Sequence, residues 1–377
     1  MKSCNVILDL TEDCMLRCSY CYINGGESHL KMNAETAINT VKKFAKSYKD
    51  GIVYLLFHGG EPLLVFDRIQ EIVNYINDED IRNIKLYIQT NAIEVDENIA
   101  RYLFESNIKT CVSIDGFTPE ANACRRSENE DVYTITGRIL KGMDYLINAG
   151  HKLSTICVLN KKNINFINQY IEESAERGIF LVSMNPIINL GRSIQHEELL
   201  LENEEISQGY ISIIQKINTL IEKGHEIIER NSLYYYRRFI SEKPEYMCMN
   251  TPCGAGTCVF VIKCNGDIFP CSDFSFNPDL KLGNVNSEIL FSLENGQPRR
   301  MLHELYTDSL EHNEKCAKCR WKKKCSSGCS ARKYLATGKI GGALDPLCSV
   351  YEAINTFFAS SDKNISHFTN SAGAKVI

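Results

Sequence analysis

Three cysteines near the N-terminus, Cys14, Cys18 and Cys21, have types and spacing that suit metal chemistry. Thiolates are the usual protein ligands of iron–sulfur clusters, and most such clusters have four of them. The spacing C-x3-C-x2-C offers three thiolates from one short loop and leaves a fourth iron without a protein ligand. A zinc knuckle is the alternative that this spacing allows. We expect a [4Fe–4S] cluster whose open iron binds a further molecule.

A second group of cysteines lies in the C-terminal third of the chain. Of the 17 cysteines, ten fall between positions 248 and 348. Scattered cysteines are usually small buried side chains, whereas clusters at ligand spacing favour metal binding in a reducing compartment. The spacing of seven of them is the informative part, and these are Cys253, Cys271, Cys316, Cys319, Cys325, Cys329 and Cys348.

The elements that must position these residues follow from residue patterns over positions 5 to about 186. Apolar β-rich runs alternate with amphipathic stretches. This alternation predicts an α/β fold with a parallel sheet covered by helices, here a partial (β/α)6 TIM-like barrel open on one side. Ligands bind at the carboxyl ends of such strands, where the Cys14 loop lies. The predicted strands are 5–10, 52–58, 85–90, 109–114, 152–159 and 179–185, and the predicted helices are 34–48, 66–77, 97–105, 132–149 and 164–177.

We divide the chain into a partial barrel over 1–190, a helical connector over 191–247, a small cysteine-rich domain over 248–360 that binds auxiliary clusters, and a disordered tail over 361–377. The connector contains a helical pattern over 203–223 and a Tyr/Arg cluster over 234–238 that we interpret as core packing. The 44% hydrophobic and 24% charged residues of this 377-residue chain are ordinary for a globular protein. The net charge of -5 and the absence of a long apolar run argue against nucleic acid and membrane partners, and predict a cytoplasmic protein.

The run around Cys14, with Tyr20 before its last cysteine, resembles the radical S-adenosylmethionine (SAM) superfamily. In that family the amino and carboxylate groups of SAM bind the open iron. The segment from His58 to Pro62 is similar to the family's Gly-Gly-Glu-Pro motif, whose glycines let the backbone approach a ligand closely. The resemblance implies a ribose contact from Ser113 and a carboxylate contact from Arg125 or Arg126. The full set of expected SAM-binding residues is Tyr20, Gly59, Gly60, Glu61, Gln89, Asn91, Ser113, Asp115, Arg125 and Leu159, and Leu159 is included only for its position at the end of the fifth predicted strand.

The C-terminal cysteines, with Gly266 between the first two, match the spacing of the SPASM signature. This resemblance implies two auxiliary [4Fe–4S] clusters, and hence three clusters in all. One auxiliary cluster would be held by Cys316, Cys319, Cys325 and Cys348, and the inner one by Cys253, Cys271 and Cys329. The fourth ligand of the inner cluster stays open. We favour Cys258, with Cys264, Cys248 or a substrate thiolate as alternatives.

The resemblance covers positions 5 to about 350 and implies that SAM is cleaved reductively to a 5′-deoxyadenosyl radical, which abstracts a hydrogen from the substrate. The electron would come from an external donor, a flavodoxin or a ferredoxin. We expect a peptide or protein substrate. A metal-organised electron-transfer module and a radical SAM enzyme that acts on an oligosaccharide or small molecule are the other classes that the sequence allows.

Two peptide reactions compete. The leading hypothesis is a thioether or other crosslink in a ribosomally synthesised peptide, and the alternative is conversion of Cys or Ser in a sulfatase to formylglycine. Anaerobic sulfatase maturases place an Asp base directly after the cysteine equivalent to Cys271. This chain has Ser272 there and Asp273 one position later, which weighs against that alternative. Asp273 is the candidate catalytic base.

Overall fold

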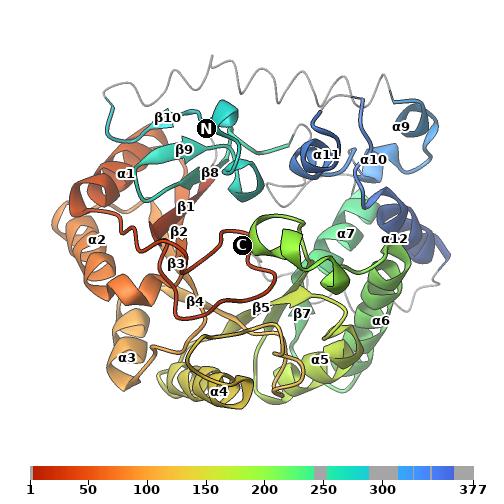
Figure 1. Ribbon diagram of the computed structural model, residues 1–377, viewed down its shortest axis with the longest axis horizontal. Coiled ribbons are helices and arrows are strands. Elements are labelled where there is room, and N and C mark those ends of the chain that lie inside the picture. The colour runs from red at the N-terminus through yellow and green to blue at the C-terminus, as the bar shows by residue number, and fades with distance from the viewer. Residues whose placement is uncertain (1–2, 242–252, 288–312, 326, 340–341, 361–377) are drawn as a thin grey trace.

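Six parallel strands lie side by side in the order in which the chain forms them. We describe residues 3–241, 253–287, 313–325, 327–339 and 342–360 of a computed structural model. A helix follows each of the first five strands and packs outside the sheet (Figure 1). This confirms the predicted α/β architecture. The strands are β1 Ser3–Thr11, β2 Ile52–Gly59, β3 Ile84–Thr90, β4 Lys109–Ser113, β5 Ser154–Leu159 and β6 Leu181–Pro186, and the helices are α1 Ala34–Ser47, α2 Phe66–Asp78, α3 Glu97–Glu105, α4 Val132–Asn148 and α5 Ile167–Glu176.

The ends of these helices carry local sequence signals. Asn33, the predicted cap of α1, accepts a hydrogen bond from the Thr36 amide at 2.8 Å. Asp96 and Asp131 cap α3 and α4 in the same way. Such caps satisfy amides that have no partner within the helix. Gly150 follows α4 with φ of 96°, a conformation that glycine adopts without steric cost.

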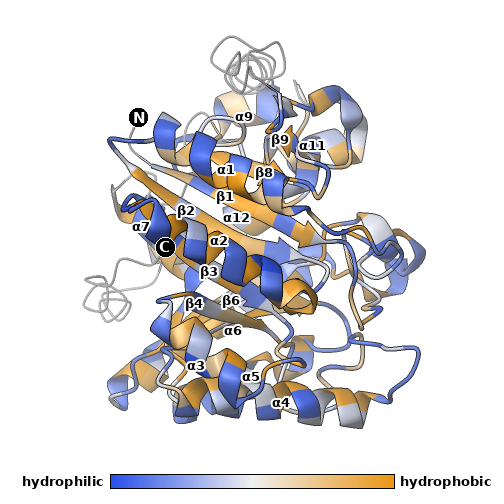
Figure 2. Ribbon diagram, turned by 90° about the vertical axis from the view of Figure 1, so that its left-hand side faces the viewer, coloured by the Kyte–Doolittle hydropathy of each residue, from blue (hydrophilic) through white to orange (hydrophobic). Residues whose placement is uncertain are grey.

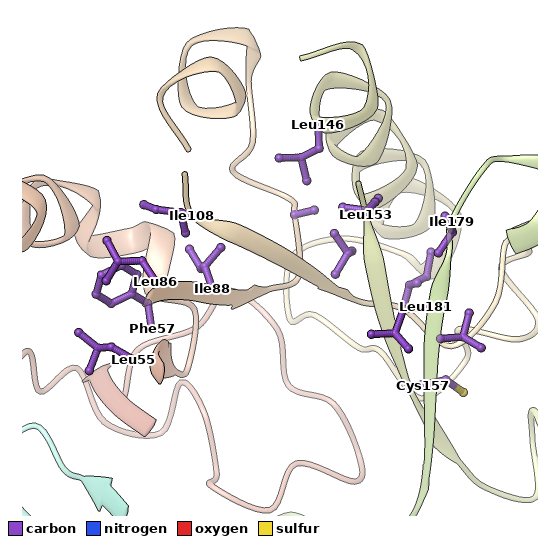
Figure 3. Packing of buried hydrophobic residues seen from close by; sticks show 14 of the residues in the cluster. Leu55, Phe57, Leu86, Ile88, Ile108, Leu146, Leu153, Cys157, Ile179 and Leu181 are labelled. Carbon is purple, nitrogen blue, oxygen red and sulfur yellow. The ribbon is translucent and has the colours of Figure 1, made fainter. Parts of the chain in front are cut away.

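Alternate residues of each strand face opposite sides of the sheet, which divides the core from the interior of the barrel. In β2, Leu55 and Phe57 are buried against the helices, whereas Tyr54, Leu56 and His58 line the interior. Figure 3 shows this outer core, where side chains of β2, β3, β5 and β6 meet residues of the surrounding segments, Leu146 of α4 among them. In Figure 2 the strands are mainly apolar and the outward side of α2 is hydrophilic.

The sheet extends beyond the six predicted strands at both ends. β7 (Ile228–Glu229) pairs in parallel with β6, and β8 (Val259–Ile262) pairs in parallel with β1. β9 (Asp267–Phe269) and β10 (Gly283–Asn284) continue beyond β8 as antiparallel strands. The strands β8, β9 and β10 of the cysteine-rich region therefore belong to the barrel sheet. Over the described residues the sheet ends at β7 and β10, so the barrel is partial.

The predicted connector contains two helices, α6 (Asn203–Glu222) and α7 (Arg230–Ser241). The C-terminal helix α12 (Cys348–Ser360) packs on both. Tyr235 meets Tyr351 edge to face at a centroid distance of 5.7 Å, so the tyrosine cluster serves packing here. None of the described helices combines the length and apolar character needed to cross a lipid bilayer. The predicted tail over 361–377 lies outside the described residues.

The remaining short helices lie in the cysteine-rich region. They are α9 (Glu314–Lys318), α10 (Lys322–Cys325) and α11 (Ser330–Thr337), and they lie together beside α12 in Figure 1. A single-turn 3₁₀ helix, η6 (Ser272–Phe274), follows Cys271. Another, η3 (Gly191–Gln195), follows β6.

Candidate functional site

The barrel encloses a cavity of about 1150 Å³. Its wall is formed by the inward residues of the strands, by the loop between β1 and α1 and by part of the cysteine-rich region. Two groups of thiols therefore line one cavity, an arrangement that was not predicted from the sequence. The cysteines of these two groups that line it are Cys14, Cys18, Cys21, Cys253, Cys271, Cys325 and Cys329, and Cys111 of β4 lines it as well.

The first three thiols lie on the loop directly after β1. Backbone amides point at two of the sulfurs, since Gly25 N lies 3.3 Å from Cys21 Sγ and Leu16 N lies 3.4 Å from Cys14 Sγ. Such contacts stabilise a thiolate and tune a metal centre that it binds. Burial raises the pKa of the Cys18 thiol to about 12, so a metal must supply the charge that keeps this sulfur deprotonated.

Arg192 of η3 fixes this loop, and sequence reasoning missed it. Its guanidinium donates to Cys18 O at 3.0 Å and to Gly25 O at 3.1 Å, and pairs with Glu27 at 3.0 Å. Its backbone N–H also donates to Cys21 O at 3.0 Å. A Gly-Arg pair after a strand is too common a sequence feature to have indicated this role.

Glycines keep side chains out of the space above the cysteine loop. A Cβ atom on Gly59 would lie 2.2 Å from Thr11 O, and one on Gly60 would lie 2.0 Å from Asp13 O. Gly25 faces them, and its own added Cβ would lie 3.5 Å from Gly60 Cα. The turn after β2 therefore packs directly against the backbone of the cysteine loop, and this close approach requires glycine. The contact of Gly59 and Gly60 with SAM stays a prediction.

Glu61 is buried behind this wall and does not line the cavity. Its carboxyl group accepts from Leu63 N at 3.1 Å, Thr90 Oγ1 at 2.7 Å and Asn91 N at 2.8 Å. Burial raises the pKa of Glu61 to about 7, while these hydrogen bonds oppose the rise. Its contacts tie the end of β2 to the end of β3, so its predicted contribution to SAM binding would act through the position of Asn91.

Asp115, Arg125 and Tyr20 form a second buried polar group. Arg125 Nη2 lies 3.2 Å from Asp115 Oδ1, and Tyr20 donates its hydroxyl to the other carboxylate oxygen. Arg125 lines the cavity, and its Nε is buried without a hydrogen-bond partner among the described residues. A buried guanidinium N–H without an acceptor suits a ligand carboxylate, so the site fits the amino-acid end of SAM.

The other predicted SAM-binding residues divide into two sets. Gln89, Asn91 and Ser113 line the cavity, and Gln89 Nε2 lies 3.3 Å from Ser113 Oγ. Leu159 is fully buried in the core and does not reach the cavity, where its neighbour Val158 lies instead. Asp115 also stays behind the wall, and it contacts the cavity-lining residues Tyr20, Arg125 and Val158.

Four cysteines of the C-terminal segment lie within electrostatic reach of one another. The charges of Cys316, Cys319 and Cys348 all act on Cys325, whose pKa burial raises to about 12. These are the four thiols predicted for one auxiliary cluster. The other three, Cys253, Cys271 and Cys329, pack around a second small core of Ala255, Phe274, Leu280 and Ala331.

The proposed fourth ligands lie in different places. Cys258 packs against the main core, and its sulfur accepts from Thr257 Oγ1 at 3.8 Å. Cys264 is buried and points its thiol at Asp9 O, 3.1 Å away. Cys248 lies outside the described residues. The predicted base Asp273 lines the cavity, and burial raises its pKa.

No group of three or more His, Cys, Asp or Glu side chains in the described ranges is placed to hold a single metal ion.

The fold and the two thiol groups define a radical SAM enzyme with auxiliary iron–sulfur centres. Residues 8–174 match the radical SAM superfamily, and residues 253–320 match the SPASM iron–sulfur cluster-binding domain. The chain belongs to the radical SAM superfamily and carries a SPASM domain, so both resemblances found in the sequence are confirmed. Its cofactors are SAM, a SAM-binding [4Fe–4S] cluster and auxiliary clusters.

Three relatives show how far the similarity extends. A cysteine-type anaerobic sulfatase-maturating enzyme of Clostridium novyi (strain NT) is 26% identical over 386 residues, which cover 98% of this chain and 97% of the relative. An uncharacterised protein of Methanocaldococcus jannaschii is 30% identical over 75% of this chain and 89% of its own length. The solved structure of native anSMEcpe with bound AdoMet and Kp18Cys peptide has a TM-score of 0.84, with 20% identity over 97% of this chain and 99% of that one.

Proposed function

We propose that this protein oxidises a cysteine or serine side chain in a peptide segment to formylglycine. The observation that carries the proposal is similarity to a cysteine-type anaerobic sulfatase-maturating enzyme over 98% of this chain and 97% of the relative. A likeness that ended with the barrel would support SAM cleavage alone. Here it also includes the region of the auxiliary thiols, where substrate specificity would be determined.

The cavity supports a peptide substrate. Leu335 and Ala336 of α11 and Leu347 before α12 line one part of it, and the cysteine loop lines another. A cavity with apolar wall residues and a few convergent polar groups suits an extended segment that delivers one side chain to the reaction centre. The cofactor supplies the radical when bound, and the chain holds the substrate and excludes water.

The test uses a peptide that contains Cys-x-Pro-x-Arg, with SAM and an anaerobic reductant. We expect the cysteine to lose two hydrogens and then to exchange sulfur for oxygen, which gives an aldehyde that a hydrazide probe captures. The same peptide with Ala in place of Cys is the control and should stay unchanged. Formation of 5′-deoxyadenosine without any change in peptide mass would remove this substrate.

A crosslinking reaction is the second candidate, because of one departure from the sulfatase maturases. By the sequence resemblance, the sulfatase maturases have their Asp base directly after the cysteine equivalent to Cys271. This chain has Ser272 at that position. A crosslinked product would also lose two hydrogens but would keep its sulfur as a thioether. Coexpression with a cysteine-containing precursor peptide, followed by alkylation of free thiols and mass spectrometry, separates the two reactions. A flavodoxin or ferredoxin is the proposed electron donor for either.

A further inference from the structure

A chain of buried polar groups joins the barrel to the cysteine-rich region beside the cavity. His58 Nδ1 lies 3.0 Å from Asp9 Oδ1, and the other oxygen of Asp9 pairs with Lys263 Nζ at 2.8 Å. On its far side, His58 Nε2 lies 3.5 Å from the hydroxyl of Tyr22. That hydroxyl also lies near Ser272. These groups come from β1, β2, the turn after β8, the cysteine loop and η6, and neither cluster nor SAM binding accounts for them.

His58 occupies a position from which it can touch a substrate. Among the described residues that line the cavity it is the single histidine, and Asp273 is the single carboxylate. His58 lies at the end of β2, directly before Gly59, and its ring faces Tyr22, which follows Cys21. It is therefore close to the place where the sequence motifs put SAM. Asp273 lies near Arg332 and Cys329, on the auxiliary side of the cavity.

The contacts of His58 assign its two nitrogens different roles. A carboxylate can only accept, so Nδ1 carries the hydrogen that is donated to Asp9. The lone pair then lies on Nε2, where a contact of 3.5 Å with Tyr22 is too long to engage it strongly. Lys263 neutralises Asp9 from the other side, so the carboxylate orients the ring as half of a buried ion pair. A general base held by a third group in this way is ready to take a proton.

We propose that Nε2 of His58 accepts the proton that the substrate releases during its oxidation, with Asp9 as the positioning residue. This rests on the proposed function. When the radical derived from SAM has taken one hydrogen atom from the –CH₂–SH group of a substrate cysteine, a carbon radical remains. That radical becomes a thioaldehyde, –CH=S, by losing the thiol proton to Nε2 and one electron to an acceptor of the iron–sulfur class. A serine substrate would lose its hydroxyl proton in the same step.

The first test needs no substrate. The holoenzyme is labelled with ¹⁵N-histidine, and the His58 signals are assigned by their loss in His58→Gln. We expect the Nδ1–H tautomer near neutral pH, with Nε2 unprotonated. An Nε2–H tautomer or a stable imidazolium would overturn the proposal, because neither can accept a proton at the cavity. This outcome is independent of whether the sulfatase-type peptide is the substrate.

The second test separates hydrogen abstraction from product formation. His58→Gln should keep its iron content, its peptide dissociation constant and its 5′-deoxyadenosine production, while product per 5′-deoxyadenosine falls about 10²-fold, the range of general base catalysis. His29→Gln, a change of an exposed histidine in the loop between β1 and α1, is the matched control and should behave as the unmodified enzyme. Product formation by His58→Gln within about threefold of the unmodified enzyme, or a larger loss in Asp273→Asn, would overturn the assignment.

If the unmodified enzyme leaves the Cys-x-Pro-x-Arg peptide unchanged, the proposed function fails and the proposal for His58 does not. The tautomer then decides alone whether this imidazole is a base. If the peptide is converted and the tautomer is wrong, the function stands and the proton acceptor must be sought elsewhere.

Discussion

The barrel and the cysteine-rich segment over 313–325 achieve order in different ways. In the barrel, side chains such as Leu8, Phe57 and Ile88 are completely buried in one continuous core. In the segment, α9 and α10 bury no residue at all. A short helix without an apolar core is not stable in water by itself. The comparison indicates that burial organises the barrel and that metal–thiolate bonds organise the segment.

The boundary between the part of the chain ordered by burial and the part ordered by metal binding does not coincide with the start of the cysteine-rich region. β8, β9 and β10 lie among the auxiliary thiols in sequence, yet they extend the barrel sheet, and Phe260 and Ile268 belong to the main core. The inner cluster site is therefore attached to the barrel by hydrogen bonds and apolar contacts. The outer cluster site lies on α9, α10 and the start of α12. Loss of the inner cluster and loss of the outer cluster should therefore have different structural consequences.

The largest expected effect is on the cysteine loop. Replacing Cys14, Cys18 and Cys21 with Ala should abolish 5′-deoxyadenosine formation, because no other thiols in the described cavity are placed to hold the SAM cluster. Iron should fall from roughly twelve to roughly eight per chain, at four per [4Fe–4S] cluster. Thermal stability of the barrel should fall only modestly, because Leu16 keeps this loop in the main core while Cys14 and Cys18 pack only partly buried against it. Continued SAM cleavage would contradict the cluster assignment.

Cys325→Ala tests the other side of the comparison. It should also leave roughly eight irons per chain, yet retain SAM cleavage and lose product formation. Amide exchange over 313–325 should accelerate toward that of an unstructured chain, while β2 and β3 keep their protection.

Cys157→Ala changes a buried barrel cysteine and is the control for both the cysteine-loop variant and Cys325→Ala. It should keep full iron content and reduce stability by about 1 kcal/mol through a small core cavity. If amide exchange over 313–325 were equally fast in Cys325→Ala and Cys157→Ala, the order of this segment would not depend on its metal.

Gly60→Ala should have the next largest effect, within the barrel itself. The added methyl would lie 2.0 Å from Asp13 O, so the cysteine loop must move. We expect a loss of about 1–3 kcal/mol in stability, as for overpacked sites, and weaker SAM binding by equilibrium dialysis. Gly137→Ala in α4 is the matched change, because its added methyl meets nothing within 4 Å. That variant should gain about 0.5–1 kcal/mol in stability and bind SAM normally.

The same comparison explains which features the sequence could predict. Strand and helix periodicity gave the six barrel strands and α1–α5, because each element buries one face against a common core. Thiol spacing gave the two metal regions. The pairing of β8 with β1 joins residues such as Asn5 and Val259, and nothing in a four-residue apolar run indicates its partner. Arg192 and the Asp9–His58 pair were missed for the same reason, since their roles come from contacts between segments far apart in sequence.

The smallest expected effect is that of Arg192→Lys, which measures how much of the loop geometry depends on one forked side chain. Arg192 reaches Cys18 O and Gly25 O with two different nitrogens, and an ammonium group cannot reproduce both bonds. We expect a stability loss of about 1–2 kcal/mol and faster amide exchange over 12–32, with iron content kept. The SAM-induced change in the electron paramagnetic resonance spectrum of the reduced cluster should need more SAM.

Arg82→Lys changes an exposed ion pair with Asp80 and serves as the control for Arg192→Lys, with an expected effect within about 0.5 kcal/mol. If Arg192→Lys behaved like that control, the cysteine loop would be held by its own backbone turns and by the glycine contacts. The barrel would then position its metal loop without help from η3, and only the C-terminal segment would depend on its clusters for local order.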